Sequence, residues 1–117
     1  MSKRILIVDD DVQLAEEMAE ILRDEGFLID SVFSGLKAMP LVKKNHYDLY
    51  LLDYKMGDVG CGDLVRAIKR ENPSSKILVV SGRPTVEKNL KDEKVLDLIV
   101  DIVAKPFDVE KFLQKVS

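Results

Sequence analysis

Carboxylate side chains stand directly after two apolar runs of this sequence, where they could hold a cation or accept a charged group. The run at residues 5–8 is followed by three acids, Asp9, Asp10 and Asp11, and Asp53 ends a later apolar run. Adjacent carboxylates in one crevice repel each other by about 4 kcal/mol per pair at ~4 Å and an effective dielectric of ~20. They therefore need a cation or shared protons. Helix capping, which aspartate favours, explains Asp11 but not all three acids.

A hydroxyl and an amine complete the set. Ser81 follows the apolar residues 77–80, and Lys105 follows residues 96–103, which are apolar except for Asp97 and Asp101. Oxygen ligands of this kind suit Mg²⁺, which one or two carboxylates typically hold together with phosphate oxygens and water. Carboxylates can form aspartyl phosphates, while Mg²⁺, a lysine and a hydroxyl stabilise charge on the transferring oxygens. The residue types indicate phosphoryl transfer with Mg²⁺ as the cofactor.

Five apolar runs alternate with helical patterns along the chain. We expect strands at residues 5–8, 27–32, 47–52, 77–80 and 96–103, and helices at 11–25, 34–45, 63–72, 84–93 and from 108 onward. Five β-α units predict an α/β fold with a parallel sheet and right-handed crossovers. Of the doubly wound arrangements, the flavodoxin-like order 2-1-3-4-5 fits five strands, and its ligand crevice lies at the carboxyl ends of strands one and three.

Glycine, serine and proline residues indicate where these helices begin, end or bend. Gly26 is expected to end the first helix in a left-handed cap, and Ser34 to cap the second. Pro40 falls inside the second helix and should kink or break it. The fourth helix is weakly anchored, because only Val86 and Leu90 share an inward face.

Length and composition describe one soluble domain over residues 1–117, with 46% apolar and 33% charged residues. A net charge of -3 gives no basic footprint for direct nucleic-acid binding. The apolar runs are far shorter than the ~18 residues of a membrane span, and no signal-peptide pattern is present. We therefore expect a cytoplasmic protein. Cys61 is the only cysteine, and we interpret it and His46 as structural.

Four segments closely resemble the receiver domain of two-component response regulators, the CheY-like superfamily. They are Ile-Leu-Ile-Val-Asp-Asp-Asp at 5–11, Tyr-Asp-Leu-Tyr-Leu-Leu-Asp at 47–53, Val-Val-Ser at 79–81 and Lys-Pro-Phe at 105–107. Each motif alone is weak, but four in the right order and strand context are a strong signal. The resemblance covers the whole chain, and the 2-1-3-4-5 order is itself exemplified by a protein of this family.

The resemblance implies a role for each site residue. Asp53 would take a phosphoryl group from a phosphohistidine on a sensor histidine kinase or a histidine phosphotransfer protein. Asp9, Asp10 and Asp53 would hold Mg²⁺ together with the backbone carbonyl of Lys55. Ser81 and Lys105 would each contact a phosphoryl oxygen, and the family's cis bond before the proline would aim Lys105 inward.

The implied function is that of a phosphorelay signalling phosphoacceptor rather than an enzyme, although it would catalyse its own phosphorylation from small donors and its own slow dephosphorylation. Phosphorylation would reshape the face formed by helix four, strand five and helix five, which a downstream output domain or protein reads and which is a candidate homodimer surface.

Three features depart from the family pattern. Ile102 stands where the family usually has an aromatic residue, Gly57 where a proline is common, and the connection from Ser81 to Lys105 is about two residues longer than typical. A short last helix is consistent with excision from a longer protein.

Two alternatives remain. A receiver-like scaffold that binds partners without being phosphorylated predicts the loss of one pocket residue, yet all five are present. A haloacid-dehalogenase-type phosphatase also uses an aspartyl phosphate, but Gln13 stands where that family has Thr or Val, and the chain has no room for a cap domain.

Overall fold

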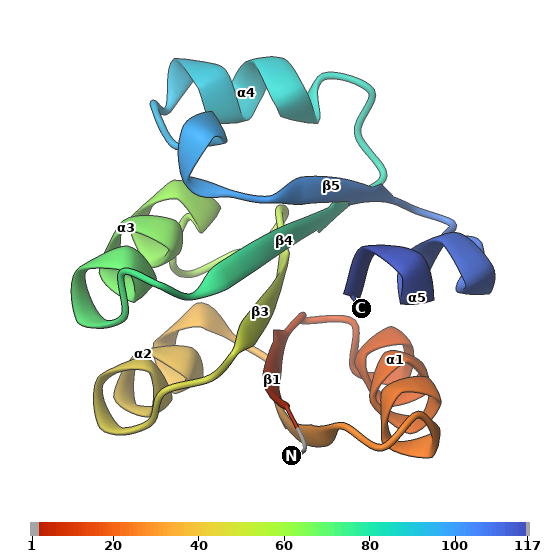
Figure 1. The fold of residues 1–117 in the computed structure, drawn as a ribbon. Helices are drawn as coiled ribbons and strands as arrows, with labels where there is room; N and C mark the ends of the chain where they lie inside the picture. The colour runs from red at the N-terminus through yellow and green to blue at the C-terminus, as the bar shows by residue number, and fades with distance from the viewer. Residues whose placement is uncertain (1–2, 117) are drawn as a thin grey trace.

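The computed structural model describes residues 3–116, which form one five-stranded parallel sheet with helices on both faces (Figure 1). The strands are β1 (Arg4–Val8), β2 (Leu28–Val32), β3 (Leu49–Asp53), β4 (Lys76–Ser81) and β5 (Asp101–Ala104), in the order β2-β1-β3-β4-β5. The helices are α1 (Val12–Asp24), α2 (Gly35–Lys44), α3 (Cys61–Glu71), α4 (Val86–Asp92) and α5 (Val109–Val116). The predicted fold class and strand order are confirmed. No helix within residues 3–116 is both long and apolar enough to cross a membrane.

The sheet separates two hydrophobic cores. Ile5 and Ile7 of β1 pack with α1 and α5, whereas Leu6 and Val8 pack on the face covered by α2, α3 and α4 (Figure 1). All four side chains are fully buried. A central parallel strand is covered on both faces, which explains why its sequence is a continuous apolar run. The edge strand β2 is only half-buried, in agreement with its alternating pattern.

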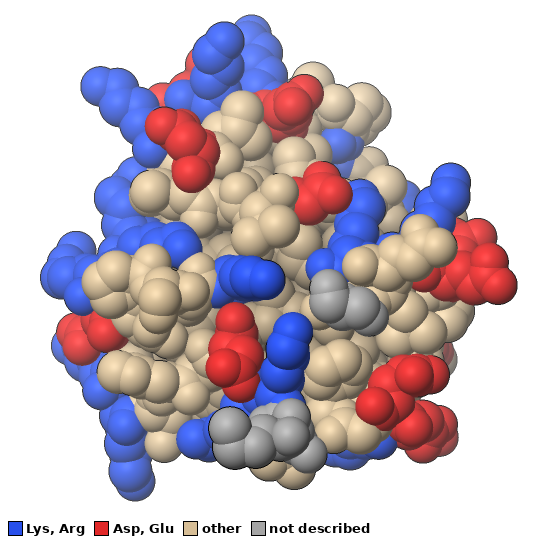
Figure 2. Space-filling view, in the orientation of Figure 1, with Lys and Arg blue, Asp and Glu red and all other residues tan. Residues whose placement is uncertain are grey.

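Charge is unevenly divided between the two helical layers. The exposed residues of α1 and of the turn after it are mostly acidic: Glu16, Glu17, Glu20, Asp24 and Glu25, with Arg23 as the basic exception. In contrast, α2 carries lysines and no acid. Figure 2 shows Lys and Arg mostly on the side of α2, α3 and α4, and acidic residues gathered on the side of α1. Although the net charge is small, the domain therefore has one mainly acidic side and one mainly basic side.

Local capping explains where α1 and α2 begin and where α1 ends. The carboxylate of Asp11 accepts the backbone N–H of Leu14, and the Ser34 hydroxyl accepts that of Lys37, so both residues are N-caps. Gly26 has a φ of 94°, which favours glycine, and it ends α1 as predicted. Pro40 does not break α2, which continues to Lys44 although proline lacks one backbone donor.

Four predicted boundaries were wrong by two residues or more. The third strand begins at Leu49 rather than at Tyr47. The third helix begins at Cys61, two residues before Asp63, because Gly60 already has the extended backbone of an N-cap. The fourth helix begins at Val86 rather than Pro84. The predicted strand 96–103 is largely a turn: residues 96–98 form a 3₁₀ helix, and β5 contains only Asp101–Ala104.

The shorter β5 has a local cause at the end of α4. Lys94 adopts a left-handed φ of 62°, and the backbone N–H of Val95 donates to the carbonyl of Leu90 at 3.0 Å. These are features of a Schellman cap, which usually has glycine at the left-handed position. Val95 is consequently buried as part of this cap rather than as part of a strand. Because no glycine occupies the left-handed position, the sequence pattern did not predict this cap.

Candidate functional site

The carboxyl ends of four strands meet at one edge of the sheet and bring the predicted site residues together. Asp9 and Asp10 follow β1, Asp53 ends β3, Ser81 ends β4, and Lys105 follows β5. All of them except Asp9 line a cavity of about 700 Å³, which Lys55 also lines. Parallel pairing of β3 with both β1 and β4 explains this convergence, because it aligns the ends of those strands.

The three acids after β1 divide into two groups. Asp9 is 1% exposed and Asp10 is exposed, and one carboxylate oxygen from each lies within 4.8 Å of the other and of an oxygen of Asp53. Asp11 instead caps α1, and its backbone N–H donates to Oδ1 of Asp9 at 2.9 Å. Asp9 and Asp10 therefore belong to the carboxylate cluster with Asp53, while Asp11 supports the helix and orients Asp9.

Lys105 is the cation of the cluster. Its Nζ lies 3.2 Å from Oδ1 of Asp53 and 3.3 Å from Oδ2 of Asp9. The Lys105–Pro106 peptide bond is cis, as the family resemblance implied. One ammonium group thus faces two buried carboxylates, and the third carboxylate, Asp10, adds negative charge that this lysine does not balance.

Burial and neighbouring charge favour the protonated form of Asp53. Burial and the negative charge of Asp9 raise the pKa of Asp53 to about 6, although Lys105 acts in the opposite direction. Burial alone would lower the pKa of Lys105, but the carboxylates of Asp53 and Asp9 outweigh it and raise that pKa. The cluster therefore has a deficit of positive charge, which a bound cation would remove.

The carboxylate cluster fits a divalent metal ion. Oδ2 of Asp9 is buried and accepts no hydrogen bond from the described residues, with Lys105 as its ion-pair neighbour. Three carboxylates within 4.8 Å form an all-oxygen donor set that suits a hard divalent cation such as Mg²⁺. Within residues 3–116, no other group of three or more carboxylate, histidine or cysteine side chains has a spacing that could hold a metal ion.

Ser81 presents its hydroxyl to the same cavity. Its side chain is 5% exposed, and its Oγ accepts the backbone N–H of Arg83 at 3.0 Å. A hydroxyl that already accepts a hydrogen bond can still donate its own hydrogen. Ser81 can therefore donate to an anionic group placed beside Asp53.

The loop after Asp53 is tethered by a residue that the sequence analysis missed. The Asp58 carboxylate accepts the backbone N–H groups of Gly35 and Leu36 at the start of α2, at 3.1 and 3.0 Å. These bonds, with that of Val59, hold the pKa of Asp58 below its usual value. In the sequence, Asp58 among glycines indicates only a turn, since its partners lie 22 and 23 residues away.

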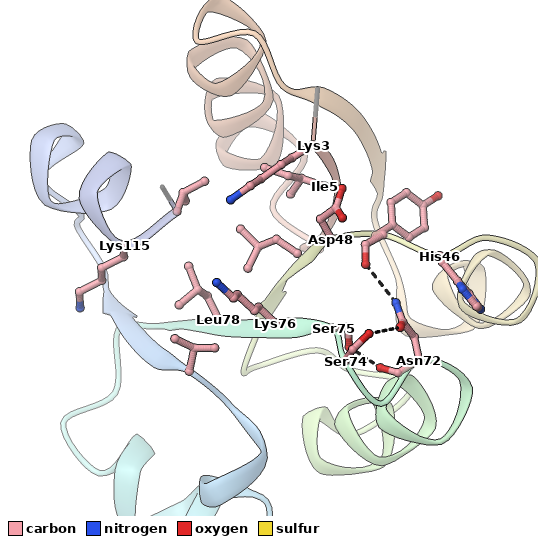
Figure 3. A pocket seen from close by; sticks show the side chains of 14 residues that line it. Lys3, Ile5, His46, Asp48, Asn72, Ser74, Ser75, Lys76, Leu78 and Lys115 are labelled. Carbon is pink, nitrogen blue, oxygen red and sulfur yellow. Dashed lines mark hydrogen bonds between the residues drawn. The ribbon is translucent and has the colours of Figure 1, made fainter. Parts of the chain in front are cut away.

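The two residues interpreted as structural lie outside this cluster. Cys61 is buried, and burial together with the charges of Glu93 and Asp53 raises its pKa to about 12. It therefore lacks the thiolate character of a reactive cysteine. His46 is exposed and lines a separate cavity of about 510 Å³ at the amino ends of the strands (Figure 3). Lysines dominate the charged rim of that cavity, with Asp48 as its one acid.

Comparison with known proteins identifies the family. The response regulator receiver domain model matches residues 5–117. The chain belongs to the response regulator receiver domain family. This receiver domain is 32% identical to the transcriptional regulatory protein CusR of Escherichia coli K12 over 114 residues, which cover 97% of the chain and 49% of CusR. The chain thus spans about half the length of the curated relatives it matches. Membership in this family of signalling proteins also argues against the haloacid-dehalogenase alternative.

Solved structures agree with the receiver fold. A receiver domain from Methanospirillum hungatei JF-1 has a TM-score of 0.89 and 25% identity, covering 99% of this chain and 91% of that one. A response regulator from Burkholderia pseudomallei, described with a phosphorylated aspartic acid, a calcium ion and citrate, has a TM-score of 0.86 at 22% identity. The match covers 99% of this chain and 67% of the Burkholderia chain.

Proposed function

We propose that Asp53 is the phosphoacceptor of this receiver domain and that residues 1–117 act as one phosphoaccepting unit. A carboxylate oxygen of Asp53 would attack the phosphorus of a phosphohistidine on a sensor histidine kinase or a histidine phosphotransfer protein. The P–N bond breaks, the imidazole nitrogen leaves with the electron pair, and an acyl phosphate forms. The observation that carries the proposal is the position of Asp53: it lines the cavity, and its Oδ1 lies 3.2 Å from Nζ of Lys105.

Mg²⁺ is the proposed cofactor. Asp9, Asp10 and Asp53 would hold it through their carboxylates, and Lys55, which also lines the cavity, would contribute its backbone carbonyl. Bound there, the ion would supply positive charge for the carboxylates and for the transferring phosphoryl oxygens. Support for this assignment comes from the raised pKa of Asp53 and from the buried Oδ2 of Asp9, which accepts no hydrogen bond from the described residues.

Ser81 and Lys105 are proposed to hold the phosphoryl group. The Ser81 hydroxyl would donate to one phosphoryl oxygen, and the Lys105 ammonium would pair with another. Support comes from their places at the ends of β4 and β5, where both line the same cavity as Asp53. The scaffold alternative predicted that one residue of this set would be missing, whereas the chain retains all of them.

The output is proposed to pass through the face formed by α4, β5 and α5 to a downstream output domain or protein. Phosphorylation adds roughly -1.5 to -2 charges to the cavity, which would draw in Ser81 and bias the neighbouring elements. CusR is a transcriptional regulatory protein about twice as long as the match, which supports an output domain in the full-length protein. Homodimerisation through this face stays a prediction.

We further propose that the domain phosphorylates itself from small donors and slowly removes its own phosphoryl group, without acting on a separate substrate. The protein should be incubated with Mg²⁺ and acetyl phosphate, and its intact mass compared with that of Asp53→Asn and of a sample in EDTA. We expect a single labile phosphoryl adduct on the wild type alone. An equal adduct on Asp53→Asn, or none on a wild type shown to bind Mg²⁺ and offered a phosphohistidine donor, would contradict the proposal.

A further inference from the structure

A second polar cluster lies directly behind Asp53, on the face covered by α3 and α4. Tyr54 follows Asp53 in the chain, and its hydroxyl donates to Oε2 of Glu93 at 2.6 Å. The guanidinium carbon of Arg83 lies 5.8 Å from the centre of the Tyr54 ring. We call Tyr54, Arg66, Arg83 and Glu93 the Tyr54 cluster; the proposed phosphotransfer chemistry uses none of them.

Glu93 attaches the carboxyl end of α4 to two other elements. Its carboxylate accepts the Tyr54 hydroxyl, and its backbone carbonyl accepts Nη1 of Arg66 from α3 at 2.9 Å. The carboxylate also occupies space left by Gly62, where an added Cβ would lie 2.7 Å from Oε1 of Glu93. Any larger residue at position 62 would displace Glu93. The end of α4 is therefore held against β3 and α3 by specific contacts.

The rest of α4 has few other anchors. The helix has seven residues, of which Val86 and Leu90 are buried, and its N-cap Thr85 makes no side-chain capping bond. A short helix with two buried side chains opens at low free-energy cost, so single contacts at its end strongly influence its position. The Tyr54–Glu93 hydrogen bond is one of these contacts.

Arg83 connects the Tyr54 cluster to the phosphoacceptor cavity. Its backbone N–H donates to Oγ of Ser81, its guanidinium lies over the Tyr54 ring, and it lines the same cavity as Asp53. Within residues 3–116, the Arg83 guanidinium has no carboxylate partner in an ion pair. A charge-assisted bond to a phosphoryl oxygen is stronger than an exposed cation–π contact.

We propose that Arg83 leaves the Tyr54 ring for the phosphoryl group on Asp53, and that the Tyr54 cluster thereby transmits phosphorylation to the carboxyl end of α4. This inference rests on the proposed phosphorylation of Asp53. Without the Arg83 guanidinium over its ring, Tyr54 loses its cover and its hydroxyl bond to Glu93 weakens. Tyr54 has both a ring and a hydroxyl and performs this coupling. Ile102, which has neither, cannot perform it.

Amide hydrogen exchange of residues 86–95 tests this coupling. The metal-free wild type is compared with Tyr54→Phe, and with Tyr47→Phe as a matched control, because the Tyr47 hydroxyl donates to Asp30 at the opposite edge of the sheet. Loss of one hydrogen bond should accelerate exchange in 86–95 roughly fivefold in Tyr54→Phe. Tyr47→Phe should leave this segment unchanged.

The second arm adds Mg²⁺ and beryllofluoride, a mimic of the phosphoryl group, with ¹⁹F NMR to show that it is bound. Wild-type exchange in 86–95 should rise by a similar factor, whereas Tyr54→Phe and Arg83→Ala should bind the mimic without a further rise. The coupling is overturned if the mimic accelerates exchange in Tyr54→Phe and Arg83→Ala as much as in the wild type. It is also overturned if metal-free Tyr54→Phe exchanges residues 86–95 at the wild-type rate. If the mimic does not bind the wild type, the proposed phosphoacceptor site fails as well, and the ¹⁹F signal distinguishes the two failures.

Discussion

Nζ of Lys105 lies 3.2 Å from Oδ1 of Asp53, although 52 residues separate them in the chain. The same ammonium group lies 3.3 Å from Oδ2 of Asp9. Lys105 is therefore shared between the proposed phosphoacceptor and a proposed metal ligand, and it is 23% exposed, so that an incoming anion can reach it. Its removal should affect chemistry and electrostatics together.

Replacement of Lys105 by methionine should slow phosphorylation of Asp53 by acetyl phosphate roughly 10²- to 10³-fold, because a preorganised positive charge at the transferring oxygens is lost. The measurement is the initial rate of adduct formation by intact mass at saturating Mg²⁺. Lys111→Met removes an exposed lysine of α5 and should leave the rate unchanged. Equal rates in wild type and Lys105→Met would show that Lys105 has no part in the transfer.

The raised pKa of Asp53 makes the metal-free protein sensitive to pH. The carboxyl binds its proton more tightly in the folded state, with a pKa of about 6, than in the unfolded chain, where the ordinary value is 3.8. Its stabilising contribution is present below pH ~4 and is lost as the pH rises through ~6, a loss of about 3 kcal/mol in the free energy of unfolding. Relative to the wild type, Asp53→Asn should therefore gain stability over this pH range.

Urea unfolding of both proteins in EDTA at pH 4.5 and pH 7.5 measures this difference. Comparison of the two proteins cancels the titration of the acids that lie away from Asp53, which is common to both. A difference between wild type and Asp53→Asn that does not grow with pH would be incompatible with a raised pKa at Asp53.

Addition of Mg²⁺ should stabilise the wild type by about 1.4 kcal/mol at a concentration ten times its Kd. The effect should be larger at pH 7.5 than at pH 5, because protons compete with the ion for Asp53. Asp10→Asn should weaken the response, while Asp24→Asn, an exposed acid of α1, should retain it. The readout is the urea midpoint with and without the ion; an undiminished response in Asp10→Asn would remove that residue from the metal site.

Asp11 and Asp10 should behave in opposite ways although they are neighbours. Asp11→Ala removes the N-cap of α1 and should lower the free energy of unfolding by about 1 kcal/mol, yet it should leave Mg²⁺-dependent phosphorylation largely intact. Asp10→Ala should abolish most of the phosphorylation with little loss of stability. Unfolding curves and phosphorylation rates of the two variants check this division; similar phenotypes would refute it.

Much of the fold could be predicted because its signals are local. The apolar runs of β1, β3 and β4 are continuous because those strands are buried on both faces, and each is followed or ended by a polar site residue. Ser34 and Gly26 identified helix ends through capping preferences that depend only on neighbouring backbone. The prediction failed around residues 94–100, where Lys94 adopts a left-handed conformation without being glycine, so the turn before β5 gave no local signal.

The sequence by itself determined the β-α alternation, the strand order by analogy and the choice of candidate site residues, because apolar periodicity and the residue types at strand ends are properties of the chain. Only the tertiary structure decided how these residues share charge: Asp11 turns away to cap α1, while Lys105 serves Asp53 and Asp9 together. It also decided that Tyr54, Arg83 and Glu93 form one cluster. Such contacts join segments distant in the chain, and their distances depend on how the layers pack, which no local pattern encodes.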